Sequence, residues 1–183
     1  MRKELDDLLC EKYPEIFKDR HGNMIETCMC WGFDVGDGWF NIIDTMCYLI
    51  QNHIDNHNKS RKRDIEYNDL LMKNDDELLR NYNSAFTKSE YVESYVQRAK
   101  EGGYRDIKDE MYQVVAIQVK EKYGGLRFYY SGGDDFIHGI VAMAENLSDI
   151  TCEQCGKPGK QNNSGWIETL CDDCRGYKLE NEE

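Results

Sequence analysis

The sequence predicts an α+β fold in which an antiparallel β-hairpin or sheet packs with several helices, followed by a zinc ribbon. Three observations carry this prediction: apolar residues recur at helical spacing, two β-rich runs meet across a Gly-Gly pair, and four cysteines stand near the C-terminus. The chain has 183 residues, about the size of one domain, and its 40% hydrophobic residues can form a core. We expect the α+β body over 1–150, the zinc ribbon over 151–176 and an acidic tail over 177–183.

Helical spacing of apolar residues accounts for most of the expected body. It predicts a helix over 2–12 and a longer one that begins at Trp39 and runs for about sixteen to nineteen residues. The polar and basic segment 52–64 is expected to be a loop. Residues 75–101 are again helical in pattern, and so are residues 134–148.

The clearest strand pair lies in the second half of the chain. The runs 112–123 and 126–131 are rich in β-branched and aromatic residues. They are separated by the Gly-Gly pair at 124–125, which predicts a hairpin with a two-residue loop. In that register Lys122 lies opposite Arg127.

The same register divides the hairpin into a polar face and an apolar face. We call the polar side the cationic face, and it consists of Gln118, Lys120, Lys122, Arg127, Tyr129 and Ser131. On this face Lys120 is expected opposite Tyr129. Ile117 and Tyr123 are expected on the other side, directed toward the core, because side chains alternate along a strand.

The cationic face has two interpretations. Like charges directly opposite each other, such as Lys122 and Arg127, cost up to about 1 kcal/mol unless an anion neutralises them. In a chain with a formal charge of −12, carboxylates of the same chain can do this, which gives a solvated face without a ligand. Alternatively, the face binds a phosphate-bearing ligand or an acidic partner, with Tyr129 available for stacking.

The C-terminal cysteines form the most specific motif in the chain. They are Cys152, Cys155, Cys171 and Cys174, spaced as C-x2-C-x15-C-x2-C. This spacing is typical of a four-cysteine zinc site, because two intervening residues let one tight turn direct both thiolates at a single ion. Four thiolates complete a tetrahedron and leave no position for a catalytic water, so we expect one structural Zn²⁺ per chain. The alternative is two unrelated cysteine pairs or a redox couple.

Charge and hydropathy limit the partners. The net charge of −12 argues against a protein that lies along the phosphate backbone of nucleic acid or on anionic lipid. The ribbon and tail are themselves acidic, with 4 basic and 7 acidic residues over 152–183, so nucleic acid could bind there only near Lys157 and Lys160. Neither a signal peptide nor a membrane-spanning run is evident, so we expect a cytoplasmic protein with no membrane partner.

Other candidate residues have simpler explanations. His53 and His57 share one helix face at i, i+4, but no third ligand is evident. Asp37 lies in a Gly-Asp-Gly turn, and no catalytic partner for it is evident. Four further cysteines are expected to be buried thiols: Cys10, Cys47 and, in an extended piece over 24–33, Cys28 and Cys30. No residue pair indicates a reaction, so we expect a protein that is not an enzyme.

Several of these stretches together resemble an uncharacterised family of small bacteriophage and prophage proteins with a C-terminal four-cysteine zinc ribbon. The resemblance is carried by Gly36–Trp39 opening a helix, Gln118–Tyr130, Ala144-Glu145 with Ser148, Cys152–Gly156, and Gly165-Trp166 with Thr169–Cys171. It implies a phage or mobile-element protein acting inside a bacterial host cell. It also implies that residues 58–110 are a variable helical insertion.

Three functional hypotheses follow. The first is a non-enzymatic binding protein that uses the cationic face to sequester a host protein or a small anionic signalling nucleotide, in order to counter host defence. The second is a nucleic-acid-associated regulator that uses the zinc ribbon and the basic segment Lys59–Arg63. The third is a nucleotide hydrolase with scattered carboxylates. The sequence leaves open whether the chain forms a homo-oligomer.

Overall fold

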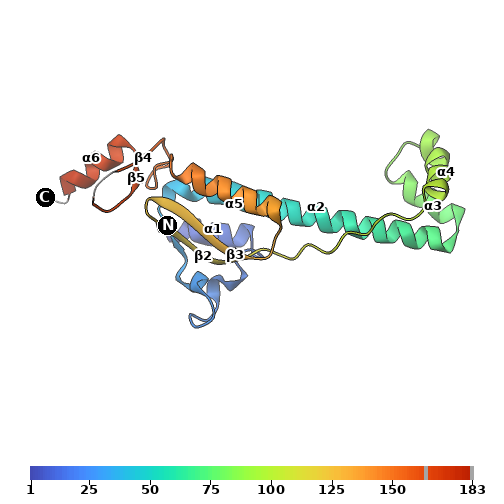
Figure 1. Ribbon diagram of the computed structural model, residues 1–183, viewed down its shortest axis with the longest axis horizontal. Helices are drawn as coiled ribbons and strands as arrows, with labels where there is room; N and C mark the ends of the chain where they lie inside the picture. The colour runs from blue at the N-terminus through green and yellow to red at the C-terminus, as the bar shows by residue number, and fades with distance from the viewer. Residues whose placement is uncertain (163–164, 182–183) are drawn as a thin grey trace. The chain divides into compact units, whose positions relative to one another are not determined.

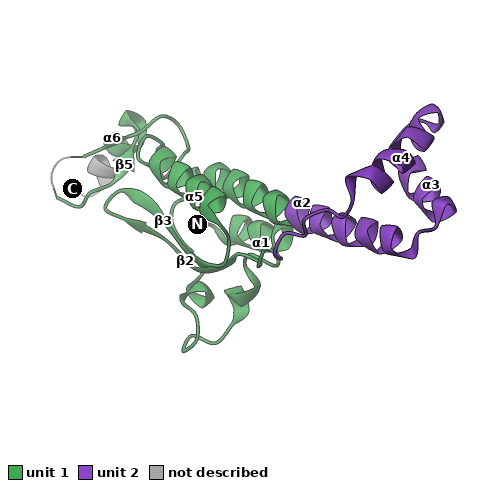
Figure 2. Ribbon diagram, turned by 45° about the vertical axis from the view of Figure 1, so that its right-hand side comes forward, with its two compact units in different colours: residues 1–54, 111–183 green, residues 55–110 purple. Residues whose placement is uncertain are grey.

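The computed structural model describes residues 1–162 and 165–181. The chain divides into two compact units, residues 1–54 with 111–183 and residues 55–110 (Figure 2). The segment 58–110, expected as an insertion, falls inside the second unit. The predicted α+β class is confirmed by helices together with a three-stranded mixed sheet and a two-stranded sheet.

The first unit contains most of the regular elements (Figure 1). Its helices are α1 (Lys3–Lys12), the N-terminal part of α2 (Phe40–Lys73), α5 (Asp135–Ser148) and α6 (Asp172–Asn181). Its strands are β1 (Phe33–Asp34), β2 (Val115–Lys122), β3 (Gly125–Ser131), β4 (Lys160–Gln161) and β5 (Thr169–Leu170). Three short 3₁₀ helices, Lys18–His21, Cys28–Trp31 and Asp37–Trp39, connect the N-terminal elements.

The extended piece expected over 24–33 is wrong for most of its length. Residues Cys28–Trp31 form a 3₁₀ turn instead, because the Thr27 hydroxyl accepts a hydrogen bond from the backbone N–H of Met29 and starts the turn. Only Phe33 continues into the strand β1, which pairs in parallel with β2. The side chain of a single residue therefore overrides the β propensity of this segment.

The hairpin exists as predicted, but its loop lies one residue earlier along the chain. The loop residues are Tyr123 and Gly124, with φ angles of 56° and 75°, and Gly125 is already in β3. Two successive positive φ angles are the requirement of a type I′ turn, whose twist matches that of the strands. The Glu121 carboxylate accepts the Gly124 N–H at 2.6 Å and thereby stabilises this turn.

This shift changes each residue's partner but not its face. Lys120 lies opposite Arg127, and Lys122 lies opposite Gly125. A displacement by two residues keeps side chains on the same side, because the period of a strand is two. Ile117 and Tyr123 are corrections: they are 42% and 68% exposed, since Ile117 lies at a β-bulge and Tyr123 in the turn.

The core lies between the apolar side of the sheet and the helices. Each of these elements contributes a fully buried side chain to one cluster: Val119 of β2, Leu126 of β3, Ile43 of α2 and Ile137 of α5. Trp39, just before α2, is also fully buried in it. In Figure 1, α5 lies along the hairpin, and the two elements are in contact. The predicted helices 2–12 and 134–148 are confirmed as α1 and α5.

Side chains of α5 cover the free edge of the sheet. The Ser148 hydroxyl accepts the Leu126 N–H at 2.8 Å, and the Glu145 carboxylate accepts the Phe128 N–H at 2.9 Å. An unpaired edge strand would otherwise expose a row of donors for pairing with another chain. Helix α5 therefore both completes the core and closes this edge of the sheet.

The expected loop over 52–64 is wrong, since α2 continues through it without interruption to Lys73. Several polar side chains within and just after this segment bind backbone rather than forming a turn. In the second unit the Arg61 guanidinium donates to the Lys108 carbonyl at 3.0 Å, and Asn68 exchanges two hydrogen bonds of 2.8 Å with the backbone of Arg105. The backbone around residues 105–108 thus provides hydrogen-bond partners for polar side chains of α2 in the same unit.

Residues 75–101 are helical, as predicted, but in two helices rather than one. They are α3 (Asp76–Ser84) and α4 (Val92–Gly102), with a short 3₁₀ turn at Ser89–Tyr91 between them. Asp75 caps α3 by accepting the N–H groups of Glu77 and Leu78. A small cluster of apolar residues, Leu79, Val92 and Val96, packs the two helices together.

Candidate functional site

The four predicted cysteines converge at the C-terminal end of the first unit. The Sγ atoms of Cys152, Cys155, Cys171 and Cys174 all lie within 4.8 Å of one another. They are positioned to hold a metal ion, and Cys152 is fully buried, whereas Cys155 is exposed. Among the side chains that the structure describes, over residues 1–162 and 165–176, no other group of three or more histidine, cysteine or acidic residues is arranged in this way.

Two different local structures supply the two cysteine pairs. In the first, Gly156 with a φ of 76° donates its N–H to the Cys152 carbonyl at 2.9 Å and closes a tight turn. The second pair stands at the start of α6, where the Cys174 N–H lies 3.5 Å from the Cys171 sulfur. The hairpin formed by β4 and β5 joins them, so residues 151–181 form one module, which we call the cysteine module.

The electrostatics of the cluster favour a cation. Burial opposes ionisation of Cys152, but the N–H groups of Cys171 and Cys155 outweigh it and lower the pKa of Cys152 to about 7. In contrast, burial and the three neighbouring thiols raise the pKa of Cys174. One thiolate is therefore readily formed, whereas four together require a positive ion, which is the behaviour expected of a metal-binding set.

A glycine-rich turn in the body binds the first turn of the cysteine module. The N–H of Gly36 donates to the Glu153 carboxylate at 2.8 Å, and that of Gly38 donates to the Glu153 carbonyl at 2.7 Å. A Cβ atom on Gly38 would lie only 2.2 Å from the Cys152 carbonyl oxygen. The close approach of the two backbones explains why residues 36 and 38 are glycines, because a side chain at either position would clash with the cysteine module. This role was not predicted from the sequence.

The aspartate between these glycines has a structural partner. Asp37 accepts a hydrogen bond from the Arg2 backbone N–H at 2.7 Å and forms an ion pair with the Arg2 guanidinium. Asp37 therefore holds the N-terminal residues onto the turn. The Gly-Asp-Gly-Trp motif predicted a tight turn. It could not predict that Arg2 docks on this turn, because Arg2 lies 35 residues away in the sequence.

The cysteine module also contacts the hairpin loop. The Thr169 hydroxyl donates to the Gly124 carbonyl at 2.6 Å, and the Gln161 amide donates to the Tyr123 carbonyl at 3.1 Å. Both bonds satisfy carbonyls of the two loop residues. The cysteine module is thus held against the body at two places, the Gly36–Trp39 turn and the hairpin loop.

The residues of the cationic face lie on β2 and β3 as one side of the sheet. Lys120 is paired with Arg127 across the hairpin and with Asp34 of β1 on its other side. Gln118 lies opposite Tyr129, whose ring centroid is 5.5 Å from the Lys120 Nζ atom. Ser131 lies at the far end of the face, opposite Val115, and Lys122 lies at the near end, opposite Gly125.

No intramolecular ion pair neutralises this face within the described part of the chain. None of the three cations, Lys120, Lys122 and Arg127, has a described carboxylate oxygen within 4.0 Å. Asp34 is the nearest acidic residue in register, and it does not reach Lys120 at that distance. Two carboxylates nevertheless flank the face: Asp34 is in register with Lys120, and a Cβ atom on Gly125 would lie 2.7 Å from the Asp149 Oδ1 and 2.9 Å from the Arg127 Nη1.

The histidines and the remaining cysteines do not converge on a site. His53 pairs with Asp134 at 2.9 Å, whereas His57 binds the Asp109 carbonyl at 2.9 Å. Cys47 is fully buried, as expected, whereas Cys10 is only partly buried against the core, and this burial raises the pKa of Cys10 to about 12. Cys30 is partly buried, but Cys28 is exposed, which corrects the expectation that it is a buried thiol.

Comparison with family models, curated proteins and solved structures finds no match to this chain. Its function must therefore be argued from its own residues. Across the described part of the chain, no helix combines the length and the apolar character needed to cross a membrane.

Proposed function

We propose that the chain is a non-enzymatic binding protein in which one structural Zn²⁺ holds the cysteine module in place and the cationic face binds a small anionic ligand, a nucleotide. The observation that carries the proposal is the row formed by Arg127 and Lys120 across the hairpin. Two cations in direct register, without a carboxylate partner within 4.0 Å among the described residues, are the feature that an anion would complete.

Zinc is the metal that best fits the cysteine cluster. With zinc–sulfur bonds of about 2.3 Å, tetrahedral geometry places neighbouring sulfurs about 3.8 Å apart. The sulfurs of Cys155 and Cys171 lie 3.6 Å apart, close to that spacing. Four protein thiolates would fill the coordination sphere, so the role proposed for the ion is structural and not catalytic.

The ligand class follows from the chemistry of the cationic face. Phosphate oxygens bind guanidinium and ammonium groups by charge-assisted hydrogen bonds, which favours Arg127 and Lys120 as phosphate contacts. Tyr129 is 42% exposed beside Lys120 and offers a ring on which a base can stack. Gln118, opposite Tyr129, adds an amide donor and acceptor at the same place.

The experiment is a calorimetric titration of the zinc-loaded chain with nucleoside mono-, di- and triphosphates and cyclic nucleotides. We expect one class to bind, and the double substitution Lys120→Gln with Arg127→Gln to weaken it at least tenfold. Lys62→Gln, an exposed lysine of the second unit, is the matched control and should bind as the unmodified chain does. Absence of binding by every nucleotide would refute the ligand assignment.

The metal assignment has its own measurement. Elemental analysis by mass spectrometry should find one zinc per chain, and Cys171→Ser should lower this value, whereas Cys28→Ser should not. A chain that folds with no zinc would refute this part of the proposal without affecting the ligand titration.

A further inference from the structure

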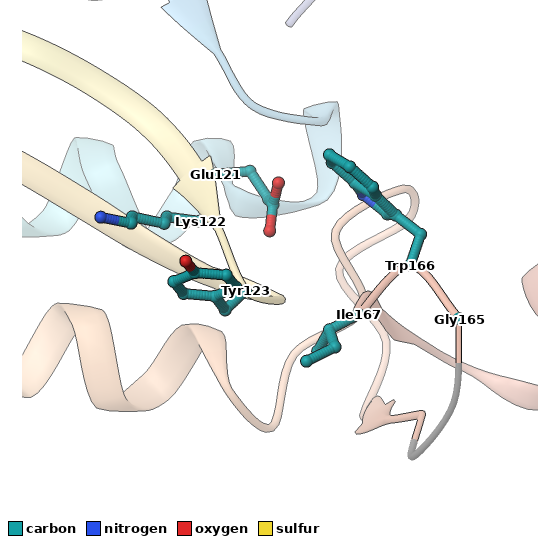
Figure 3. A pocket seen from close by; sticks show the side chains of 6 residues that line it. All are labelled: Glu121, Lys122, Tyr123, Gly165, Trp166 and Ile167. Carbon is teal, nitrogen blue, oxygen red and sulfur yellow. The ribbon is translucent and has the colours of Figure 1, made fainter.

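A groove lies where the hairpin loop meets the cysteine module, beside the Lys122 end of the cationic face. It encloses about 340 Å³ and is lined by Glu121, Lys122, Tyr123, Gly165, Trp166 and Ile167. Figure 3 shows the Tyr123 ring and the Trp166 indole on opposite sides, with the Glu121 carboxylate between them. The Lys122 side chain extends away from Trp166 in the same view.

The aromatic walls are unusually exposed. Trp166 is 75% exposed and Tyr123 is 68% exposed, so neither side chain is held by core packing. Tyr123 also adopts a φ of 56°, a conformation that costs a non-glycine residue about 1–2 kcal/mol. A large aromatic at a turn position that suits asparagine or glycine indicates that the ring has a use at the surface.

The carboxylate in the groove is fixed in place but has no cation. One oxygen of Glu121 accepts the Gly124 N–H at 2.6 Å, which orients the group at the base of the groove. Among the described residues no lysine, arginine or histidine nitrogen pairs with it within 4.0 Å. The neighbouring Lys122 instead lies with its Nζ 5.5 Å from the Tyr123 ring centroid.

We infer that this groove binds an arginine side chain presented by a peptide segment of a partner protein. A guanidinium is planar, so it can stack against an indole or phenol ring while donating to a carboxylate, a combination that a compact ammonium matches less well. Negative charge that complements a guanidinium is present in the groove, at Glu121, and on the chain as a whole, which has a net charge of −12.

This site has the opposite sign to the cationic face, and it does not depend on that face binding a nucleotide. Glu121 and Lys122 are consecutive in β2, so their side chains lie on opposite sides of the sheet. One hairpin therefore offers a cationic surface on one side and an aromatic and acidic groove at its tip. A basic peptide and a nucleotide would share only Lys122, which lines the groove and also ends the cationic face.

The test uses the full zinc-loaded chain and nuclear magnetic resonance, which detects weak binding. The probe is a Gly-Ser peptide with one central arginine, and its control is the same peptide with neutral citrulline. We expect the Gly124 amide signal to shift saturably with the arginine peptide, and the affinity for the citrulline peptide to be at least tenfold lower.

Two pairs of variants locate the effect. Glu121→Gln keeps an amide oxygen to accept the Gly124 N–H, so the turn is retained while the charge is lost, and the affinity should fall about tenfold. Its matched control is Glu11→Gln, an exposed glutamate of α1. Trp166→Ala should likewise weaken binding about tenfold, whereas Trp31→Ala, which removes another exposed indole, should not.

Three outcomes would overturn the inference. They are equal affinity for arginine and citrulline, a Gly124 signal that does not shift in a saturable way, and Glu121→Gln binding as tightly as the unmodified chain. A dispersed amide spectrum of Glu121→Gln establishes that the variant is folded, so that a loss of affinity reports on the groove.

Discussion

The indole Nε1 of Trp39 donates a hydrogen bond of 2.8 Å to the backbone carbonyl of Thr151, the residue immediately before the first cysteine of the cluster. Trp39 is completely buried at the end of the 3₁₀ helix that precedes α2, so its ring belongs to the core while its N–H reaches the cysteine module. Tryptophan suits this position because it combines a large apolar surface with a single donor. The cysteine cluster is therefore fixed to the body by the buried Trp39 side chain.

The docking turn predicts a strong effect at Gly38. In Gly38→Ala the new methyl would lie 2.2 Å from the Cys152 carbonyl oxygen, so the two backbones must separate. We expect a loss of about 1–3 kcal/mol in the free energy of unfolding, measured by urea denaturation. Gly139→Ala is the control, because nothing lies within 4 Å of that position in α5, and it should stabilise the chain by about 0.5–1 kcal/mol. Equal stabilities for the two variants would contradict the docking role.

The closure of the β3 edge predicts a cost at Ser148. Its side chain is fully buried and accepts the Leu126 N–H, so Ser148→Ala leaves a buried donor without a partner. We expect a loss of about 1–3 kcal/mol and faster exchange of the Leu126 amide hydrogen. Ser94→Ala is the control, since that exposed hydroxyl only donates to the Tyr91 carbonyl, and it should change the stability by less than about 0.5 kcal/mol. An unchanged Leu126 exchange rate would count against this account.

The strained turn predicts that a substitution at Tyr123 can raise the stability of the fold and at the same time weaken binding at the proposed arginine site. Tyr123→Asn creates an Asn-Gly pair, which readily adopts two positive φ angles, and should raise the free energy of unfolding by about 1 kcal/mol. The same variant should bind the arginine peptide more weakly, because one wall of the groove is lost. Tyr112→Asn removes a similarly exposed ring elsewhere and should do neither. A destabilised Tyr123→Asn would show that the ring itself supports the fold.

An ion pair in the N-terminal region predicts a pH dependence. Burial opposes ionisation of Asp6, but the bidentate contact with Arg20, at 2.9 and 2.8 Å, outweighs it and lowers the pKa of Asp6. A carboxyl pKa lowered by folding stabilises the protein above the pKa of the unfolded chain, and this stabilisation is lost as the pH falls through the folded value.

The measurement compares the unmodified chain with Asp6→Asn by urea denaturation from pH 7 down to pH 3. At pH 7 the variant should be less stable by about 2 kcal/mol, and the difference should narrow as the pH falls below about 4. Asp7→Asn is the control, because the exposed Asp7 pairs only with Lys3 at the surface. A constant difference between the unmodified chain and Asp6→Asn over the whole range would contradict the pKa shift.

Local patterns were sufficient wherever neighbouring residues decide the structure. The spacing of the cysteine pairs predicted that their sulfurs converge, because a two-residue turn fixes each pair almost independently of the rest of the chain. The apolar stripes predicted α1 and α5, since burying one face of a helix follows from its period.

The sequence by itself therefore determined the α+β class, the hairpin and the set of four cysteines that is positioned to hold a metal ion. Only the tertiary structure decided the hairpin loop, because Tyr123 accepts its left-handed conformation where Gln161 and Thr169 bind the loop carbonyls. It also decided that α2 continues through residues 52–64 and that Gly38 meets Cys152. Each of these depends on a partner segment distant along the chain, which neither local propensity nor hydrophobic periodicity can specify.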